Sequence, residues 1–244
     1  MARYPKQDDP DGEVVVPSVT EIISDCTDSS APLMQWSSNM TVQYLKECLE
    51  NIAFEYQTAI PRGVFLSWLD DARFNFRKVS QDALDIGSEV HNAIEWYLKN
   101  GRIPTFKTQE AINAFKAFHK WKVEHNLEPI ALEHTVYGNG WAGTLDIDCM
   151  LDDKRYIIDL KTSKSFYPEH RYQVAAYRIA VEDETQDEEN YPQGCGILRL
   201  DKVTGLPSWH DTSKTFEKDY QIFKAMFKLY KLRHPIIMKR ARGE

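Results

Sequence analysis

Apolar residues recur along this chain with two spacings, one typical of helices and one typical of strands. A spacing near 3.6 residues predicts helices; the stretches are 20–24, 40–56, 80–100, 108–126 and one that opens at Pro168. Short apolar runs between turn residues predict strands; these are 135–137, both halves of 143–161, 194–200 and 208–210. A helix-rich first third followed by strands and helices predicts an α/β fold with a mixed central β-sheet.

Residues 143–161 are predicted to form a β-hairpin. The polar stretch 152–155 separates two apolar runs and supplies turn residues. A turn centred on Asp152-Asp153 sets Asp146 opposite Asp159 and Thr144 opposite Lys161, and paired residues share a face. One face then carries Thr144, Asp146, Asp148, Ile157, Asp159 and Lys161. The other is an apolar core face with Leu145, Ile147, Cys149, Tyr156, Ile158 and Leu160.

The polar face of this hairpin gathers three carboxylates and an ammonium group. Two carboxylates directly opposite each other repel by roughly 0.2–1 kcal/mol. A bound divalent cation would turn that cost into an attraction. Taken alone, the hairpin fits a solvated outer face of an antiparallel sheet equally well, because charged residues alternate there too.

Two predicted helices carry further candidate residues. In 80–100, Ser80 would cap the start, and His91 and Glu95 lie four residues apart on one side. In the helix after Pro168, Gln173 and Tyr177 share a face in the same way. A lone helical histidine is more often structural than a ligand, and the second helix has apolar residues that pack, so neither pair decides the function alone.

Five short motifs occur in one order along the chain. They are Pro17-Ser18-Val19-Thr20 with Leu33 to Trp36, Gly87 to His91, Gly143 to Asp146, Asp159 to Lys161, and Gln173 to Tyr177. Together they make the chain resemble the PD-(D/E)XK nuclease superfamily, and within it the RecB-like exonucleases. The N-terminal segment resembles that of phage-type and mitochondrial genome-maintenance exonucleases.

The resemblance implies a restriction-endonuclease-like core, with a mixed central β-sheet flanked by helices and a helix-rich N-terminal part. It implies a single nuclease domain over 1–244. Within that domain we expect a helical N-terminal elaboration at 1–78, the core at 79–216, and a basic C-terminal helix and tail at 217–244.

The resemblance also implies a metal site. His91, Asp146 and Asp159 would be the ligands, helped by the backbone carbonyl of Leu160. Magnesium favours oxygen ligands and usually takes one or two carboxylates. A histidine nitrogen suits manganese somewhat better, so we expect Mg²⁺ or Mn²⁺ to support activity.

The catalytic set implied by the resemblance is Asp146, Asp159, Lys161, Gln173 and Tyr177. Lys161 would orient the attacking water or stabilise charge, while Gln173 and Tyr177 would brace the site and touch substrate.

Three other acids are weaker candidates for the same site: Glu133, Asp148 and Glu95. Glu133 precedes a predicted strand, and a surface carboxylate is the preferred interpretation for it.

Composition narrows the class of protein. Apolar residues make up 42% of the chain, which argues against disorder, and no apolar run approaches the roughly 18 residues of a membrane span. Residues 1–13 are acidic and resemble neither a secretory signal nor a transit peptide. Cys26, Cys48, Cys149 and Cys195 form no Cys-x-x-Cys pair. We therefore expect free thiols, a cytoplasmic protein of a bacterial cell or phage-infected host, and no iron–sulfur cluster, unlike the RecB-like nucleases that hold one with four cysteines.

The net charge of −7 is unusual for a DNA-binding protein, but it is unevenly distributed. Residues 218–244 contain eight basic and two acidic residues, whereas 182–189 contain six acids. The basic C-terminus could follow a phosphate backbone. Alternatively, its helix packs Tyr220, Phe223, Phe227 and Tyr230 on the core and leaves the lysines solvated; both interpretations can hold together.

These observations predict a metal-dependent DNA exonuclease that hydrolyses phosphodiester bonds of single-stranded DNA or DNA ends. Replication or recombination proteins are possible partners, and no membrane is expected. Candidate aromatics for stacking on bases are Trp36, Phe54, Tyr56, Phe65 and Trp68, although a core role is the preferred interpretation for each. The alternatives are a structure-specific DNA endonuclease and a catalytically inactive nuclease-fold DNA-binding module; the intact Asp146, Asp159 and Lys161 argue against the latter.

Overall fold

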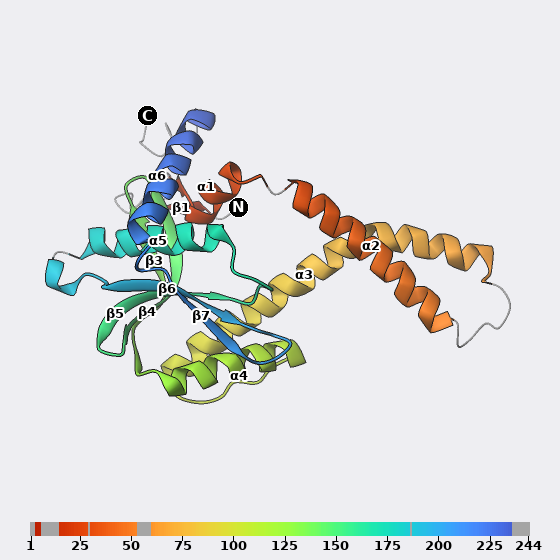
Figure 1. The fold of residues 1–244 in the computed structure, drawn as a ribbon, viewed down its shortest axis with the longest axis horizontal. Coiled ribbons are helices and arrows are strands. Elements are labelled where there is room, and N and C mark those ends of the chain that lie inside the picture. The colour runs from red at the N-terminus through yellow and green to blue at the C-terminus, as the bar shows by residue number, and fades with distance from the viewer. Residues whose placement is uncertain (1–2, 6–14, 29, 53–59, 186, 236–244) are drawn as a thin grey trace. The chain divides into compact units, whose positions relative to one another are not determined.

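A computed structural model describes residues 3–5, 15–28, 30–52, 60–185 and 187–235. The chain divides into two compact units. One comprises residues 1–27 and 87–244, and the other comprises residues 28–86. The first unit is α/β and contains a five-stranded sheet with helices on both faces (Figure 1).

The sheet has the order β3-β4-β5-β6-β7. Its strands are β3 (Leu127–Gly138), β4 (Trp141–Leu151), β5 (Lys154–Lys161), β6 (Gly194–Leu200) and β7 (Pro207–Asp211). Neighbours are antiparallel except β5 and β6, which are parallel and are joined through helix α5 (Pro168–Glu184) and the short η1 (Glu188–Asn190). A parallel pair needs such a crossover. The expected mixed central sheet is therefore confirmed.

The predicted hairpin register is confirmed over Ile147 to Leu151 of β4 and Lys154 to Ile158 of β5. Ile147 pairs with Ile158 and Leu151 with Lys154. The two turn residues, Asp152 and Asp153, have φ angles of 48° and 67°. Two consecutive left-handed residues make the tight turn whose twist matches that of the strands, and aspartate tolerates this conformation better than most residues.

Helices cover both faces of this sheet (Figure 1). On one face α5 packs with α1 (Val19–Cys26) and α6 (Phe216–Arg233). On the other lies α4 (Gln109–Glu124), and Phe115 of α4 meets Tyr97 of α3 edge to face at 5.3 Å. Both faces of the hairpin are consequently buried, whereas the sequence suggested one core face and one polar face.

Residues before α1 also belong to the sheet unit. Strands β1 (Arg3–Pro5) and β2 (Val15–Pro17) form a small antiparallel sheet, and Ser18 bridges to Ala142 of β4. Ser18 also caps α1 by accepting the Glu21 N–H at 3.0 Å. Burial of Val19 and Ile22 anchors α1 in the sheet unit. The expected elaboration at 1–78 grouped this segment with the helices that follow it, whereas residues 1–27 belong to the sheet unit.

The second unit contains α2 (Ser30–Ile52) and residues 62–86 of α3 (Arg62–Asn100). Thr41 Oγ1 donates to the Ala72 carbonyl at 3.3 Å, and Trp36 meets Phe76 edge to face at 6.4 Å. The expected helix start at Ser80 is wrong, because α3 runs through it without a break. No proline or glycine interrupts 64–79, and an exposed serine inside a helix costs only tenths of a kcal/mol, roughly.

No helix among the described residues is long and apolar enough to cross a membrane. All four cysteines lie in the described residues and are free thiols.

Candidate metal and catalytic site

Asp146 joins three secondary-structure elements. Its Oδ1 lies 3.2 Å from His91 Nδ1 on α3, and its Oδ2 accepts the backbone N–H of Leu160 on β5 at 2.6 Å. Among the described residues the backbone pairing of β4 with β5 extends only as far as Ile147 and Ile158. The expected pairs Asp146–Asp159 and Thr144–Lys161 therefore do not form, because the strands separate and a side chain takes the Leu160 N–H.

Glu133 lies beside this contact. It sits on β3 between the residues that pair with Ile147 and Leu145, and its Oε1 is 3.8 Å from His91 Nδ1. Its φ angle is 47°, a left-handed conformation that costs a non-glycine residue roughly 1–3 kcal/mol. Such strain concentrates at functional sites. The structure thus places Glu133 beside His91 and Asp146, with its side chain still partly exposed to solvent.

One potential ligand atom from each of His91, Glu133 and Asp146 lies within 4.8 Å of the other two. An imidazole nitrogen and two carboxylate oxygens are donors that Mn²⁺ and Mg²⁺ accept. Asp159, the other expected carboxylate ligand, is not a member of this group as it stands.

Asp159 forms an ion pair with Lys161. The residue is 1% exposed, and Lys161 Nζ lies 2.7 Å from its Oδ2. Within the described residues neither carboxylate oxygen has an aligned hydrogen-bond partner, so the Lys161 contact is an ion pair without good hydrogen-bond angles. Burial raises the pKa of Asp159 to about 6. A buried, poorly satisfied carboxylate is costly, and a cation would satisfy it.

The remaining charges of the site support one another. Burial favours a neutral imidazole, but the carboxylates of Asp146 and Glu133 outweigh it and raise the pKa of His91 to about 10. Burial alone would raise the pKa of Asp146, yet His91 and Lys161 lower it overall. Burial alone would lower the pKa of Lys161, yet Asp159 and Asp146 raise it. Without a metal ion, the site therefore holds two cations among its acids.

Gln173 and Tyr177 of α5 form a hydrogen-bonded pair beside Gly143. Gln173 Nε2 donates to the Tyr177 hydroxyl at 3.0 Å. The Tyr177 ring packs directly on Gly143, where an added Cβ would lie 2.5 Å from a ring carbon. This close approach explains the glycine of the Gly143-to-Asp146 motif. Next to Gly143, the Thr144 hydroxyl forms a hydrogen bond with the Tyr4 hydroxyl at 2.9 Å. No sequence pattern predicted this contact.

His170 is a second neighbour that the sequence analysis missed. It lies in the first turn of α5, where its Nδ1 accepts the Tyr167 N–H at 3.4 Å. Burial and the charge of Lys161 lower the pKa of His170 to about 4, so the imidazole is neutral at physiological pH. No sequence signal distinguished it from other helical histidines.

The structure does not bring two weaker candidates into the cluster. Asp148 is buried and accepts two hydrogen bonds from Arg155, at 2.6 and 3.0 Å, so its charge is balanced within the hairpin. Glu95 pairs with Lys99 one helical turn away at 2.5 Å. Both acids have structural partners of their own.

The C-terminal helix α6 packs its aromatic residues on the core, as one of the two sequence interpretations predicted. Phe223, Phe227 and Tyr230 are buried in the core, and Tyr220 packs partly buried beside them. Four lysines of this helix are exposed: Lys218, Lys224, Lys228 and Lys231. The tail cations Lys239, Arg240 and Arg242 lie outside the described residues.

Comparison of the chain with protein-family models and with curated proteins finds no match.

Proposed function

We propose that this protein is a metal-dependent DNA exonuclease of the PD-(D/E)XK superfamily, in its RecB-like branch. It would hydrolyse phosphodiester bonds of single-stranded DNA or of DNA ends with Mg²⁺ or Mn²⁺. The observation that carries the proposal is the group His91, Glu133 and Asp146, with the buried carboxylate of Asp159 and the cation of Lys161 paired beside it.

The donor set fits a hard or borderline divalent ion. His91, Glu133 and Asp146 offer three ligand atoms close together, and Asp159 offers oxygens that lack aligned partners. The Leu160 carbonyl belongs to the peptide next to the N–H that Asp146 binds. A bound Mg²⁺ or Mn²⁺ would polarise a phosphoryl oxygen and lower the pKa of a coordinated water.

Lys161 would act as a fixed positive charge. The neighbouring carboxylates raise its pKa, so it stays protonated and is a poor proton acceptor. In that state it can donate hydrogen bonds to a phosphate oxygen and stabilise the charge that develops there. Gln173 and Tyr177 would keep α5 at a fixed distance from Gly143, and burial keeps the Tyr177 hydroxyl protonated because it raises that pKa.

The fold is consistent with a restriction-endonuclease-like core. A mixed sheet with the parallel β5–α5–β6 unit carries Asp159 and Lys161 at the end of β5. The exposed lysines of α6 supply charge that a phosphate backbone could neutralise. Among the proposed stacking aromatics, Phe65 is 41% exposed, Trp36 packs on Phe76, and Phe54 and Tyr56 lie outside the described residues.

The experiment compares end-labelled linear single-stranded DNA with covalently closed circles of the same sequence, each in Mg²⁺ and in EDTA. We expect linear DNA to be consumed in Mg²⁺ and circles to survive. Cleavage of circles would mean an endonuclease. Binding without cleavage of either substrate, in Mg²⁺ and in Mn²⁺, would mean an inactive binding module. The matched control is Glu128→Gln, an exposed carboxylate on the same strand as Glu133, and it should cut like the unchanged protein.

A further inference from the structure

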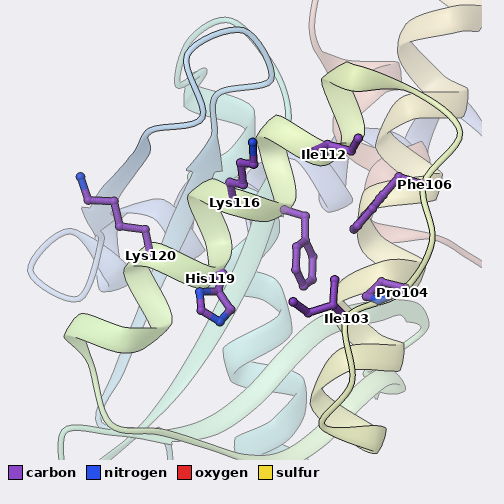
Figure 2. A pocket seen from close by; sticks show the side chains of 8 residues that line it. Ile103, Pro104, Phe106, Ile112, Lys116, His119 and Lys120 are labelled. Atoms are coloured by element: carbon purple, nitrogen blue, oxygen red, sulfur yellow. The ribbon is translucent and has the colours of Figure 1, made fainter.

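A cavity of about 410 Å³ opens between α4 and the loop that precedes it, within the sheet unit (Figure 2). Figure 2 shows Ile103, Pro104 and Phe106 of the loop facing α4, from which Ile112 and His119 complete the wall. Ile103 is 67% exposed, so an apolar side chain stands at the mouth without a covering partner. None of the lining residues belongs to the candidate metal and catalytic site.

The walls of this cavity are held in place. Phe115 is buried and contacts Phe106 and Tyr97, with ring centroids 5.1 and 5.3 Å apart. The loop itself is tied to α3, because Glu89 accepts the backbone N–H of Lys107 at 2.5 Å. A pocket with fixed walls binds a ligand without a large ordering cost.

Two lysines border the apolar cavity. Lys116 and Lys120 lie four residues apart on α4, line the pocket and are exposed (Figure 2). Neither makes an ion pair with any acid in the described parts of the chain, and no carboxylate lines the pocket. Although the chain as a whole carries a charge of −7, these two local cations beside an apolar cavity favour a ligand that combines an apolar group with negative charge.

We propose that this cavity, here called the α4 pocket, binds a short acidic peptide segment of a partner protein. One bulky apolar side chain of the peptide would enter between Ile103 and Phe115, and flanking Asp or Glu residues would pair with Lys116 and Lys120. A nucleobase fits less well, because the apolar walls would leave its polar edge groups without hydrogen bonds, which costs roughly 1–3 kcal/mol per group.

The first test titrates the full-length protein, carrying ¹³C-labelled isoleucine methyl groups, with three acetylated heptapeptides. Their sequence is Asp-Glu-Asp-X-Glu-Asp-Glu, where X is leucine, phenylalanine or tryptophan. At least one should produce saturable methyl shifts at Ile103 and Ile112. A control peptide with serine at X should bind about tenfold more weakly, because it lacks the apolar side chain. Absence of shifts with all three peptides would overturn the proposal.

The second test measures the anisotropy of the best peptide, labelled with fluorescein, on protein variants. Combining Lys116→Glu with Lys120→Glu should weaken binding about tenfold, as should Ile103→Asp alone. Lys154→Glu, an exposed lysine in the β4–β5 turn, is the matched control and should stay within about twofold of the unchanged protein. Equal binding by the double variant would overturn the proposal. Competition by a ten-nucleotide oligo-dT that shifts the same methyl groups would overturn it in favour of a nucleic-acid surface.

The two proposals fail separately. Loss of peptide binding in the double variant leaves the metal site untouched, because its residues lie elsewhere. Loss of DNA cleavage in Asp159→Asn should leave peptide binding unchanged.

Discussion

His91 Nδ1 on α3 lies 3.2 Å from Asp146 Oδ1 on β4. The other oxygen of Asp146 holds the backbone of Leu160 on β5, so one carboxylate joins a helix to two strands at the point where those strands separate. Glu133 approaches the same histidine from β3 in a strained backbone conformation. The backbone strain at Glu133 is an energetic cost of placing its carboxylate beside His91, and this cluster is the basis of the proposed metal site.

Asp159→Asn and Lys161→Ala should each reduce DNA cleavage by at least about a hundredfold, since one removes a proposed ligand and the other the fixed cation. Initial rates on end-labelled single-stranded DNA in Mg²⁺ measure this, with Glu128→Gln as the control. Circular dichroism should show both variants folded. Either variant cutting at the normal rate would refute the role of that residue.

Asp159 should also set a pH dependence of stability in EDTA. Burial raises its pKa to about 6 from 3.8, so the folded state holds this proton more tightly than the unfolded state. Below about pH 4 both states are protonated and there is no penalty. As pH rises from about 4 to 6 the unfolded carboxyl ionises while the folded one keeps its proton, and above about pH 6 folding is penalised by about 1–3 kcal/mol.

The measurement is urea unfolding of the unchanged protein and Asp159→Asn between pH 4 and 8. The asparagine variant should gain stability relative to the unchanged protein between about pH 4 and 6 and keep that gain at higher pH. A difference that is constant with pH would show that Asp159 has no raised pKa.

His91 should make metal binding release a proton. The carboxylates around it raise its pKa to about 10, and a metal ion binds only the neutral imidazole. Apparent Mn²⁺ affinity should therefore increase between pH 6 and 8. Calorimetry in buffers of different ionisation enthalpy counts the released protons.

The matching variant is His91→Ala, which should bind Mn²⁺ about tenfold more weakly and release fewer protons. Unchanged proton release in this variant would show that His91 is not a ligand.

Gly143→Ala should damage the site through packing. The new methyl group would lie 2.5 Å from the Tyr177 ring, which must shift, at a cost of about 1–3 kcal/mol. The shift should weaken the Gln173–Tyr177 hydrogen bond and lower the cleavage rate. The control is Gly63→Ala in α3, where nothing lies within 4 Å of the added Cβ. Thermal unfolding of both variants measures the difference; equal effects would mean that Gly143 is not sterically required.

The hairpin was predictable because its signals are local. The two aspartates of the turn and the alternation of apolar residues on both sides fix the register, and β4 and β5 follow it. The start of α1 at Ser18 was predictable in the same way, since a capping side chain is a local feature.

The rest of the site depends on contacts that sequence spacing does not encode. Nothing around Glu133 indicates a left-handed backbone, so its approach to His91 could not be read from the strand pattern. Ser80 resembled a helix start because serine suits that position, but an uninterrupted helix tolerates it. The polar face of the hairpin could, from its sequence alone, be a solvated outer face of the sheet. Asp159 is buried because α5 packs over that face.

The proposed metal site requires His91, Glu133, Asp146 and Asp159 to share one divalent cation. Diffraction from crystals soaked in MnCl₂, measured near the manganese absorption edge, locates such an ion. We expect one strong anomalous peak bounded by the His91 imidazole and the carboxylates of Glu133, Asp146 and Asp159, absent from Asp146→Asn crystals. A soaked crystal without a peak there, or with Asp159 turned away from the ion, would contradict the proposed metal site.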